Sequence, residues 1–274
     1  ECAGKCLDLA RPRVMGVLNV TPDSFSDGGD FLALDKALAQ ARRMADEGAD
    51  IIDVGGESTR PGAAQVSEQQ ELERVIPVIR AIAGELSIVV SVDTSKATVM
   101  REAVAAGAGL VNDVMALRAP GALEAARDSG VPVCLMHMQG EPRTMQKRPQ
   151  YRDVVQEVDE FLAQRVAACE AMGIGRDRLL LDPGFGFGKT LEHNLCLLKN
   201  LGSLTDRKLP VLVGISRKSM IGAILDEAAL EERLYGSLAA AVMAVERGAS
   251  IVRVHDVKPT VDALRVTTAV LQKG

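Results

Sequence analysis

The chain has 274 residues, of which 47% are hydrophobic and 25% are charged. This composition is ordinary for a globular protein, and the length suits one barrel of alternating strands and helices, which typically needs about 250 residues. The net charge of −5 gives no reason to expect nucleic acid or an anionic membrane as a partner. An anionic small substrate is still compatible with it, because local Lys and Arg side chains can outweigh a mild negative charge.

The five cysteines are scattered and form no C-x-x-C pair. Their spacing argues against a disulfide framework or a zinc knuckle and favours a reducing, cytosolic compartment. The N-terminal residues show no charged-then-apolar signal pattern, and no apolar stretch approaches the ~20 residues of a membrane span. We therefore expect a cytoplasmic protein without a membrane partner.

Eight short apolar runs alternate with helical patterns along the chain. The runs are rich in β-branched residues and nearly continuous in apolar side chains, which is typical of parallel strands covered by helices. The alternation predicts an α/β protein, a single (β/α)8 TIM-barrel domain over residues 1–274 with an N-terminal extension over residues 1–12; a doubly wound open sheet is the runner-up. The runs are Val14–Leu18, Asp50–Val54, Ile88–Val92, Leu110–Val111, Val131–Met136, Leu179–Leu181, Val211–Ile215 and Ile251–Val254.

Helical patterns occupy the intervals between the runs. Ser67-x-x-Gln70 predicts a capping box that opens a helix. The apolar spacing from Val154 to Val166 indicates the longest helix, closed by Gly173. Further helices are expected over Ala37–Ala45, Leu195–Leu201, Ser237–Val245 and Val261–Leu271.

Two connections, Asn19–Phe31 and Gly55–Ser67, are longer than the fold requires. Both are rich in Gly, Pro, Ser, Thr and Asp, and both follow predicted strand ends, where barrel enzymes keep their substrate loops. We therefore expect residues 19–31 and 55–67 to be mobile substrate loops rather than plain surface connections.

Polar side chains stand at or just past the end of each apolar run. In a closed barrel these ends meet at one mouth, so Asp93, Asn112 and Asp182 are expected to lie together. Three such acceptors suit a ligand with several N–H donors, such as a nitrogen heterocycle, because a carboxylate accepts two parallel hydrogen bonds from an amino-imino edge. Taken alone, Asp182 before Pro183 would be interpreted as a turn-capping aspartate.

The segment Leu179–Thr190 carries a cluster of glycines followed by Lys189. It does not match a phosphate-binding loop, because Pro183 stands where that motif needs its first glycine, and the dinucleotide pattern G-x-G-x-x-G fails as well. Phe185 and Phe187 could stack on a ring, and core packing explains each of them equally well.

On the last run, Arg253 and His255 are two residues apart and so point to the same side of the strand. An arginine inside a strand must be paired or bind something. Together with the basic turn Ser216–Ser219, the two residues predict an anion pocket; an ion-pair network with Asp53 or Asp256 is the alternative.

The three histidines show no metal-ligand spacing, which argues against a zinc site. Asn19 offers a neutral oxygen at a strand end, and this suits Mg²⁺ shared with substrate phosphates, because Mg²⁺ takes few protein ligands. The sequence indicates no functional role for His137, at the end of the fifth run.

Eight sequence blocks, in the order of the predicted strands, resemble those of the dihydropteroate synthases. These are folate-pathway enzymes that sulfonamides target, and the match is to the bacterial single-domain form of this pterin-binding TIM-barrel family. The blocks are MGVLNVTPDSFSDGG (Met15–Gly29), IIDVGGESTRPGA (Ile51–Ala63), SVDTSK (Ser91–Lys96), VNDV (Val111–Val114), LMHMQGEPRTMQ (Leu135–Gln146), LDPGFGFGKT (Leu181–Thr190), GISRKSMIG (Gly214–Gly222) and RVHD (Arg253–Asp256).

The resemblance implies a transferase that joins p-aminobenzoate to 6-hydroxymethyl-7,8-dihydropterin pyrophosphate, releasing pyrophosphate and using Mg²⁺, in a homodimer. Asp182, Lys218 and Arg253 would be catalytic. By motif position, the pterin would be held by Asp93, Asn112, Asp182 and Lys218. The pyrophosphate would be held by Arg253 and His255, and the Mg²⁺ by Asn19. The loop residues Thr59, Arg60 and Pro61 would lie near the aminobenzoate and the leaving group, and Phe187 and Ser219 would line the aminobenzoate pocket.

The residues and the resemblance agree on a dissociative mechanism, in which the C–O bond breaks before the neutral aryl amine attacks. Two alternatives use the same fold. A pterin-dependent methyltransferase acting with a corrinoid protein would have little use for Lys218, Arg253 and His255 as an anion pocket. A non-catalytic pterin-binding protein would not need the loop residues Thr59 and Arg60.

Overall fold

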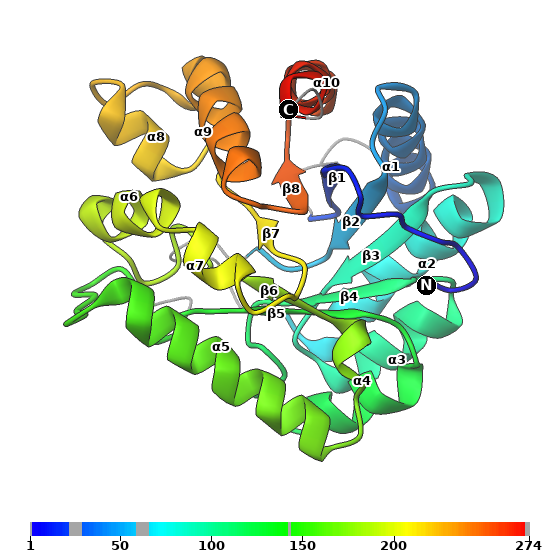
Figure 1. The fold of residues 1–274 in the computed structure, drawn as a ribbon. Coiled ribbons are helices and arrows are strands. Elements are labelled where there is room, and N and C mark those ends of the chain that lie inside the picture. Colours follow the sequence, from blue (N-terminus) through cyan, green and yellow to red (C-terminus); the bar gives the residue numbers. More distant parts are fainter. Residues whose placement is uncertain (1, 22–28, 59–65, 142–143, 272–274) are drawn as a thin grey trace.

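The computed structural model describes residues 2–21, 29–58, 66–141 and 144–271, with backbone alone for residues 29–32. Within these residues, eight strands form one all-parallel sheet in the order β6-β5-β4-β3-β2-β1-β8-β7. A parallel bridge between Leu181 and Val211 joins the two edges and closes the sheet (Figure 1). The single-domain (β/α)8 barrel is therefore confirmed, and the open sheet is excluded.

The elements alternate around the barrel as expected. The strands are β1 Arg13–Asn19, β2 Ile51–Gly55, β3 Val89–Asp93, β4 Leu110–Asp113, β5 Val133–Met136, β6 Leu179–Asp182, β7 Leu212–Val213 and β8 Ile251–Val254. The helices are α1 Gly29–Asp46, α2 Glu68–Glu85, α3 Ala97–Ala105, α4 Ala122–Ser129, α5 Val154–Ala171, α6 Leu191–Lys199, α7 Gly202–Thr205, α8 Ser219–Ile224, α9 Leu234–Glu246 and α10 Val257–Leu271, with short 3-10 helices η2 Arg176–Arg178 and η3 Leu230–Arg233.

All eight predicted strands form, and β7 departs most from its expected span. The sequence predicts a strand over Val211–Ile215, but the strand ends at Val213. A turn follows, in which the carbonyl of Ile215 accepts a hydrogen bond from Lys218 N at 3.2 Å.

The capping box at the start of α2 is confirmed, since Ser67 Oγ accepts from Gln70 N and the Gln70 side chain accepts from Ser67 N. Helix α5 has 18 residues, and α1 and α2 equal it in length, so it is not the longest. Helices α3 and α4, of nine and eight residues, are not among the helices predicted from the sequence.

The two long connections are described only in part. Helix α1 begins at Gly29, so its first residues fall inside the span expected for the first loop. Residues 22–28 of that connection and residues 59–65 of the second lie outside the described residues.

An apolar layer closes the N-terminal end of the barrel interior. Each strand contributes one buried side chain to it, and the partly buried Leu7 and Leu9 of the N-terminal segment pack against it. Lys5 fixes this segment by donating to the carbonyl of Ile88 at 2.6 Å. The interior is therefore packed rather than open at this end. The layer consists of Met15, Ile51, Val89, Leu110, Cys134, Leu180, Leu212 and Ile251, and Cys2 belongs to the same cluster.

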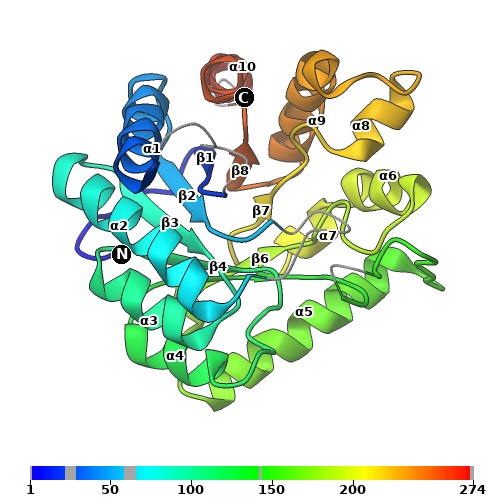
Figure 2. The same cartoon turned by 180° about the vertical axis from the view of Figure 1, so that it is seen from behind.

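The helices surround the sheet on its outer side (Figures 1 and 2). Val252 and Val254 of β8 belong to the large core between sheet and helices, which confirms that they face away from Arg253. Among the described helices, none is both long enough and apolar enough to cross a bilayer.

Candidate active site

Two residues further along the strands from the apolar layer, most of the inward-facing side chains become polar. The change follows from strand geometry, because alternate residues point to the same side and the strands are in parallel register. Asp53, Ser91, Asn112 and Asp182 are buried in this second layer, and Arg253 is partly buried. The barrel is thus apolar at its N-terminal end and polar toward its mouth.

Arg253 of β8 connects two carboxylates, from β2 and β3. Its Nε donates to Asp53 Oδ2 at 2.6 Å, and one of its terminal nitrogens donates to Asp93 Oδ2 at 2.8 Å. Burial opposes the charge, but Asp53 and Asp93 outweigh it and raise the pKa of Arg253. The ion-pair interpretation of Arg253 therefore describes this structure, with Asp53 as a partner; Asp256 is instead paired with Arg217 at 2.5 Å.

Asp53 has a central role that was not predicted from the sequence, where it appears only as an alternative partner of Arg253. A single oxygen of this carboxylate, Oδ2, accepts from both Arg253 Nε and Asn112 Nδ2, the latter at 3.1 Å. Asp53 therefore orients two of the expected site residues, on β8 and β4. The signal in the sequence is an aspartate inside the apolar run IIDVG, two residues after the inward-facing Ile51 and so on the same face of the strand.

Two buried atoms beside this network have no hydrogen-bond partner among the described residues. They are Asp53 Oδ1 and Ser91 Oγ, whose residues are paired in the register of β2 and β3. Unpaired buried polar atoms are costly unless water or a ligand satisfies them. Their position inside the barrel adds to the polar character of its mouth.

The three expected acceptors lie on the inner side of the barrel. Burial raises the pKa of Asp93 to about 7, while Arg253 opposes that shift. Burial also raises the pKa of Asp182, against the attraction of Lys218. Asp182 Oδ1 accepts from Gly184 N at 2.7 Å, so the turn-capping interpretation of this aspartate is correct as a description of its contacts.

Lys218 lies beside the turn that follows β6. Its ammonium donates to the carbonyl of Phe185 and lies 4.5 Å from the centre of the Phe187 ring. Burial lowers the pKa of Lys218 to about 8, and Asp182 opposes the shift. Phe185 itself is fully buried in the core, so core packing explains it, whereas Phe187 is only partly buried.

His255 lies just past β8, in contact with the turn after β7. Ser216 Oγ accepts from His255 N at 3.1 Å and lies 3.1 Å from His255 Nδ1. Arg217 of the same turn is held by Asp256, so this arginine is engaged away from the carboxylates of the second layer. Ser219 begins α8 and is exposed.

Asn19 ends β1 and is exposed at the mouth. A Cβ added at Gly55 would lie 3.8 Å from Asn19 Oδ1 and 3.7 Å from Asp93 Oδ2, so both oxygens border the same space. The expected loop residues Thr59, Arg60 and Pro61 lie outside the described residues.

Comparisons with known proteins identify the family. A family model described as "Pterin binding enzyme" matches residues 15–255. The dihydropteroate synthase of Escherichia coli (strain K12) is 58% identical over 268 residues, covering 98% of this chain and 95% of that protein. The chain belongs to the dihydropteroate synthase family. Dihydropteroate synthases are transferases, so the enzyme class expected from the sequence is confirmed, and the methyltransferase and non-catalytic alternatives are set aside.

Solved dihydropteroate synthases share the whole architecture. The Yersinia pestis enzyme in a sulfonamide drug complex has a TM-score of 0.95 and 54% identity, covering 99% of this chain and 98% of that chain. The Xanthomonas albilineans enzyme in complex with 7,8-dihydropteroate has a TM-score of 0.90 and 51% identity, covering 98% of this chain and 97% of that chain.

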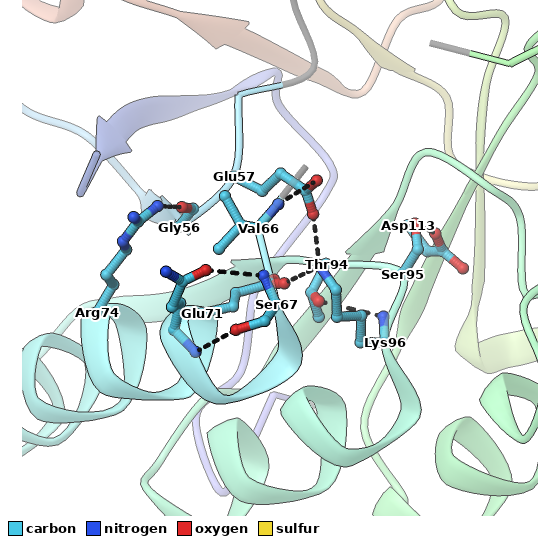
Figure 3. Close-up of polar contacts among 11 residues, drawn as sticks. Gly56, Glu57, Val66, Ser67, Glu71, Arg74, Thr94, Ser95, Lys96 and Asp113 are labelled. Atoms are coloured by element: carbon cyan, nitrogen blue, oxygen red, sulfur yellow. Dashed lines mark hydrogen bonds and ion pairs between the residues drawn. The ribbon is translucent and has the colours of Figure 1, made fainter. Parts of the chain in front are cut away.

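In this member of the family, the base of the second long connection is tied to the β3–α3 junction (Figure 3). The ammonium of Lys96 forms ion pairs with both Glu57 and Glu71, and Glu71 is buried. Glu57 Oε1 also accepts from Val66 N at 3.3 Å, which joins the residues on either side of the connection. Arg74 adds a bond to the carbonyl of Gly56 at 2.8 Å.

We predict that Lys96→Met destabilises the fold, because it leaves the buried Glu71 carboxylate without its cation. Removing one partner of a buried ion pair costs about 3 kcal/mol of unfolding free energy, measured by urea denaturation. Lys258→Met is the control, since its pair with Asp262 is exposed on α10 and should change that free energy by no more than about 0.5 kcal/mol. Equal effects of the two substitutions would contradict the role of Lys96.

Proposed function

We propose that this chain condenses 6-hydroxymethyl-7,8-dihydropterin pyrophosphate with p-aminobenzoate, giving 7,8-dihydropteroate and pyrophosphate. One observation carries the proposal: the barrel mouth combines inward-facing acceptors on β3, β4 and β6 with the cations Lys218 and Arg253. A heterocycle rich in N–H groups needs the acceptors, and a pyrophosphate needs the cations. The 58% identity to the Escherichia coli enzyme supports the same reaction.

In this proposal, Asp93, Asn112, Asp182 and Lys218 bind the pterin. The two carboxylates and the Asn112 amide supply acceptor oxygens, and Lys218 donates to the carbonyl edge of the ring. The Asp53 contact fixes the Asn112 amide, so its Nδ2 points toward Asp53 and its oxygen is left for the ligand. The site is thus oriented before the ligand arrives, which reduces the cost of binding.

The pyrophosphate is proposed to lie against Arg253 and His255. Arg253 is already charged and held by two carboxylates, and His255 is oriented by Ser216. Positive groups aimed at the leaving oxygens stabilise the charge that develops as the C–O bond breaks.

We propose Asn19 as a ligand of Mg²⁺. The fit rests on two oxygens, from Asn19 and Asp93, that border the same space over Gly55. No group of three or more His, Cys, Asp or Glu side chains among the described residues could hold a metal alone, and Mg²⁺ commonly completes its shell with water and substrate phosphates. When bound, Mg²⁺ would neutralise charge on the pyrophosphate.

The aminobenzoate is proposed to bind against Phe187 and Ser219, with Thr59, Arg60 and Pro61 completing its surroundings. Phe187 is partly buried and its ring faces the Lys218 ammonium, so it offers an apolar surface next to a cation. A benzoate has the same two-sided character, with an aromatic ring and a carboxylate.

The proposed reaction is dissociative. Breaking the C–O bond releases pyrophosphate toward Arg253 and leaves a methylene cation that the electron-rich dihydropterin stabilises. The neutral aryl amine then forms the C–N bond and loses a proton. Asp182, Lys218 and Arg253 are the proposed catalytic residues, since they hold the ring and the leaving group in line while the site excludes water.

We also propose a cytoplasmic homodimer. Free thiols at all five cysteines suit a reducing compartment.

Eight of the nine large exposed hydrophobic side chains among the described residues lie in the segment from α8 to α10, where a second copy could cover them. Sedimentation equilibrium measures this directly, and a monomer mass would contradict it. The eight are Ile224, Leu225, Leu230, Tyr235, Met243, Val266, Val270 and Leu271.

The proposed reaction predicts Mg²⁺-dependent pyrophosphate release when both substrates are supplied. Chelation of divalent cations should stop turnover, and Asp182→Asn should abolish pterin binding in calorimetry, because the amide replaces one acceptor oxygen with a donor. Absence of pyrophosphate release by the wild-type chain, or an unchanged pterin affinity in Asp182→Asn, would contradict the proposal.

The raised pKa of Asp93 predicts a pH dependence of pterin binding. For a group with a pKa of about 7, the ionised fraction rises about tenfold between pH 6 and pH 8. Only the ionised carboxylate accepts two N–H bonds. The affinity for the pterin should therefore rise by about the same factor as the pH rises. Calorimetry with 6-hydroxymethyl-7,8-dihydropterin measures this without a titrating phosphate. Asp93→Asn is the control and should bind weakly with no such slope; a slope that persists in this variant would exclude Asp93 as its source.

A further inference from the structure

Two buried basic side chains at the barrel mouth have no part in the reaction described above. They are Lys189, which is 3% exposed, and His137, which is 5% exposed. Lys189 belongs to the glycine-rich segment that does not match a phosphate-binding loop, and His137 follows β5. A buried lysine is costly unless every donor is satisfied, so its contacts call for an explanation.

The turn Pro183–Gly188 after β6 runs directly against the chain after β5. Gly184 and Gly188 have φ values of +67° and +62°, in the left-handed region that favours glycine. A Cβ added at Gly184 would lie 1.9 Å from the carbonyl oxygen of His137, and one at Gly188 would lie 2.4 Å from that of Gln139. The two backbones therefore approach closely, and side chains hold them together.

Lys189 supplies that connection. Its Nζ lies 2.9 Å from the carbonyl of Gly184, 3.1 Å from that of Phe187 and 2.9 Å from His137 Nδ1. An ammonium has three N–H donors, so these three acceptors use all of them. His137 Nδ1 must then accept, which places the proton of a neutral imidazole on Nε2.

The electrostatics agree with a neutral His137. Burial lowers its pKa to about 2, and the nearby Lys189 charge adds to that shift. Burial also lowers the pKa of Lys189 to about 7, opposed by Asp182, and donation to three acceptors requires the protonated form.

A second lysine holds the same turn. Lys218 donates to the carbonyl of Phe185 and lies over the ring of Phe187. The carbonyls of this turn are thus divided between two ammonium groups: those of Gly184 and Phe187 bind Lys189, and that of Phe185 binds Lys218. The position of Phe187 therefore depends on Lys189, through a direct bond to its own carbonyl.

We propose that Lys189, held by the imidazole of His137, is a positioning residue that sets Phe187 and the Lys218 contact for aminobenzoate. This inference rests on the proposed function, in which Phe187 lines the aminobenzoate pocket. Lys189 acts through the turn and touches no substrate. Pterin binding depends on Asp93, Asn112 and Asp182, whose positions come from the strands, and on Lys218, which has its own bond to the carbonyl of Phe185. It should therefore be much less sensitive to Lys189.

The fold has other supports in this turn, so it should survive loss of Lys189. Asp182 still accepts from Gly184 N, and Asn194 Oδ1 accepts from Gly186 N at 2.8 Å. Removing the ammonium leaves the carbonyls of Gly184 and Phe187 without their donor, and the outer part of the turn shifts. A displacement of about 1 Å in a binding group can change reactivity as much as 100-fold.

The test compares four variants by steady-state kinetics of pyrophosphate release. Lys189→Met removes the ammonium, and His137→Leu removes its imidazole acceptor. His137→Asn is the conservative variant, because the Asn oxygen can take the place of Nδ1 as acceptor. Lys199→Met is the matched control, since Lys199 is exposed at the end of α6.

We expect Lys189→Met and His137→Leu to raise the KM for aminobenzoate about tenfold while changing the KM for the pterin substrate less than about twofold. His137→Asn and Lys199→Met should stay close to wild type in both constants. Equal rises in both KM values, or a lowered Tm with both constants unchanged, would overturn the positioning role. A wild-type chain that releases no pyrophosphate would instead overturn the proposed function.

One measurement needs no substitution and no activity. In the wild-type protein with ¹⁵N-labelled histidine, NMR should show His137 as the neutral Nε2–H tautomer throughout pH 5–6, where Lys189 is protonated, with Nδ1 unprotonated. Titration of His137 in this range, or a proton on Nδ1, would exclude the bond from Lys189 and overturn the inference even if a variant failed to fold.

Discussion

The guanidinium of Arg253, shared by Asp53 and Asp93, is the interaction on which the barrel mouth depends. The carboxylates of Asp53, Asp93 and Asp182 come from three strands and converge toward the barrel mouth, and without a cation they would repel one another and resist ionisation. Arg253 reaches them from the opposite end of the chain, because the sheet places β8 beside β1, two strands from β2 and three from β3. The same Asp53 oxygen that binds Arg253 also fixes Asn112, so this ion pair between β2 and β8 orients residues on two other strands, β3 and β4.

This arrangement explains how a packed barrel can keep a polar site. The apolar layer fills the N-terminal half of the interior and supplies hydrophobic stabilisation, while the polar layer above it is held by bonds between strands. Groups that are oriented in advance do not have to be reordered as charge develops on a leaving group, and this is the main source of electrostatic catalysis. The turn after β6 extends the same principle from the strands to the surface, where two lysines hold its carbonyls.

Much of the site could be predicted from sequence because strand alternation and barrel closure are simple geometric rules. Asp93, Asn112 and Asp182 stand at strand ends, and Arg253 faces inward because Val252 and Val254 face the helices. The rules place side chains on the inner face but do not choose their partners. Asp53 could therefore be predicted only as one of two alternative partners of Arg253. The bond from Lys189 to His137 could not be predicted at all, because it joins residues 52 positions apart that no motif links. Helices α3 and α4 were not predicted, and the buried faces of both are made partly of alanine, which gives a weaker hydrophobic signal than the leucines of α6.

The central claim is that Asp53 and Arg253 act as one unit, and a double-mutant cycle on the unfolding free energy tests it most directly. Asp53→Asn and Arg253→Met should each destabilise the protein, because the first removes one of the two carboxylates that hold Arg253 and the second leaves Asp53 and Asp93 without their shared cation. The double variant should be more stable than the sum of the two changes by at least about 1 kcal/mol, because either substitution alone already removes the Asp53–Arg253 pair, which can be lost only once. Additivity within about 0.5 kcal/mol would show that the two residues do not act together and would contradict the account.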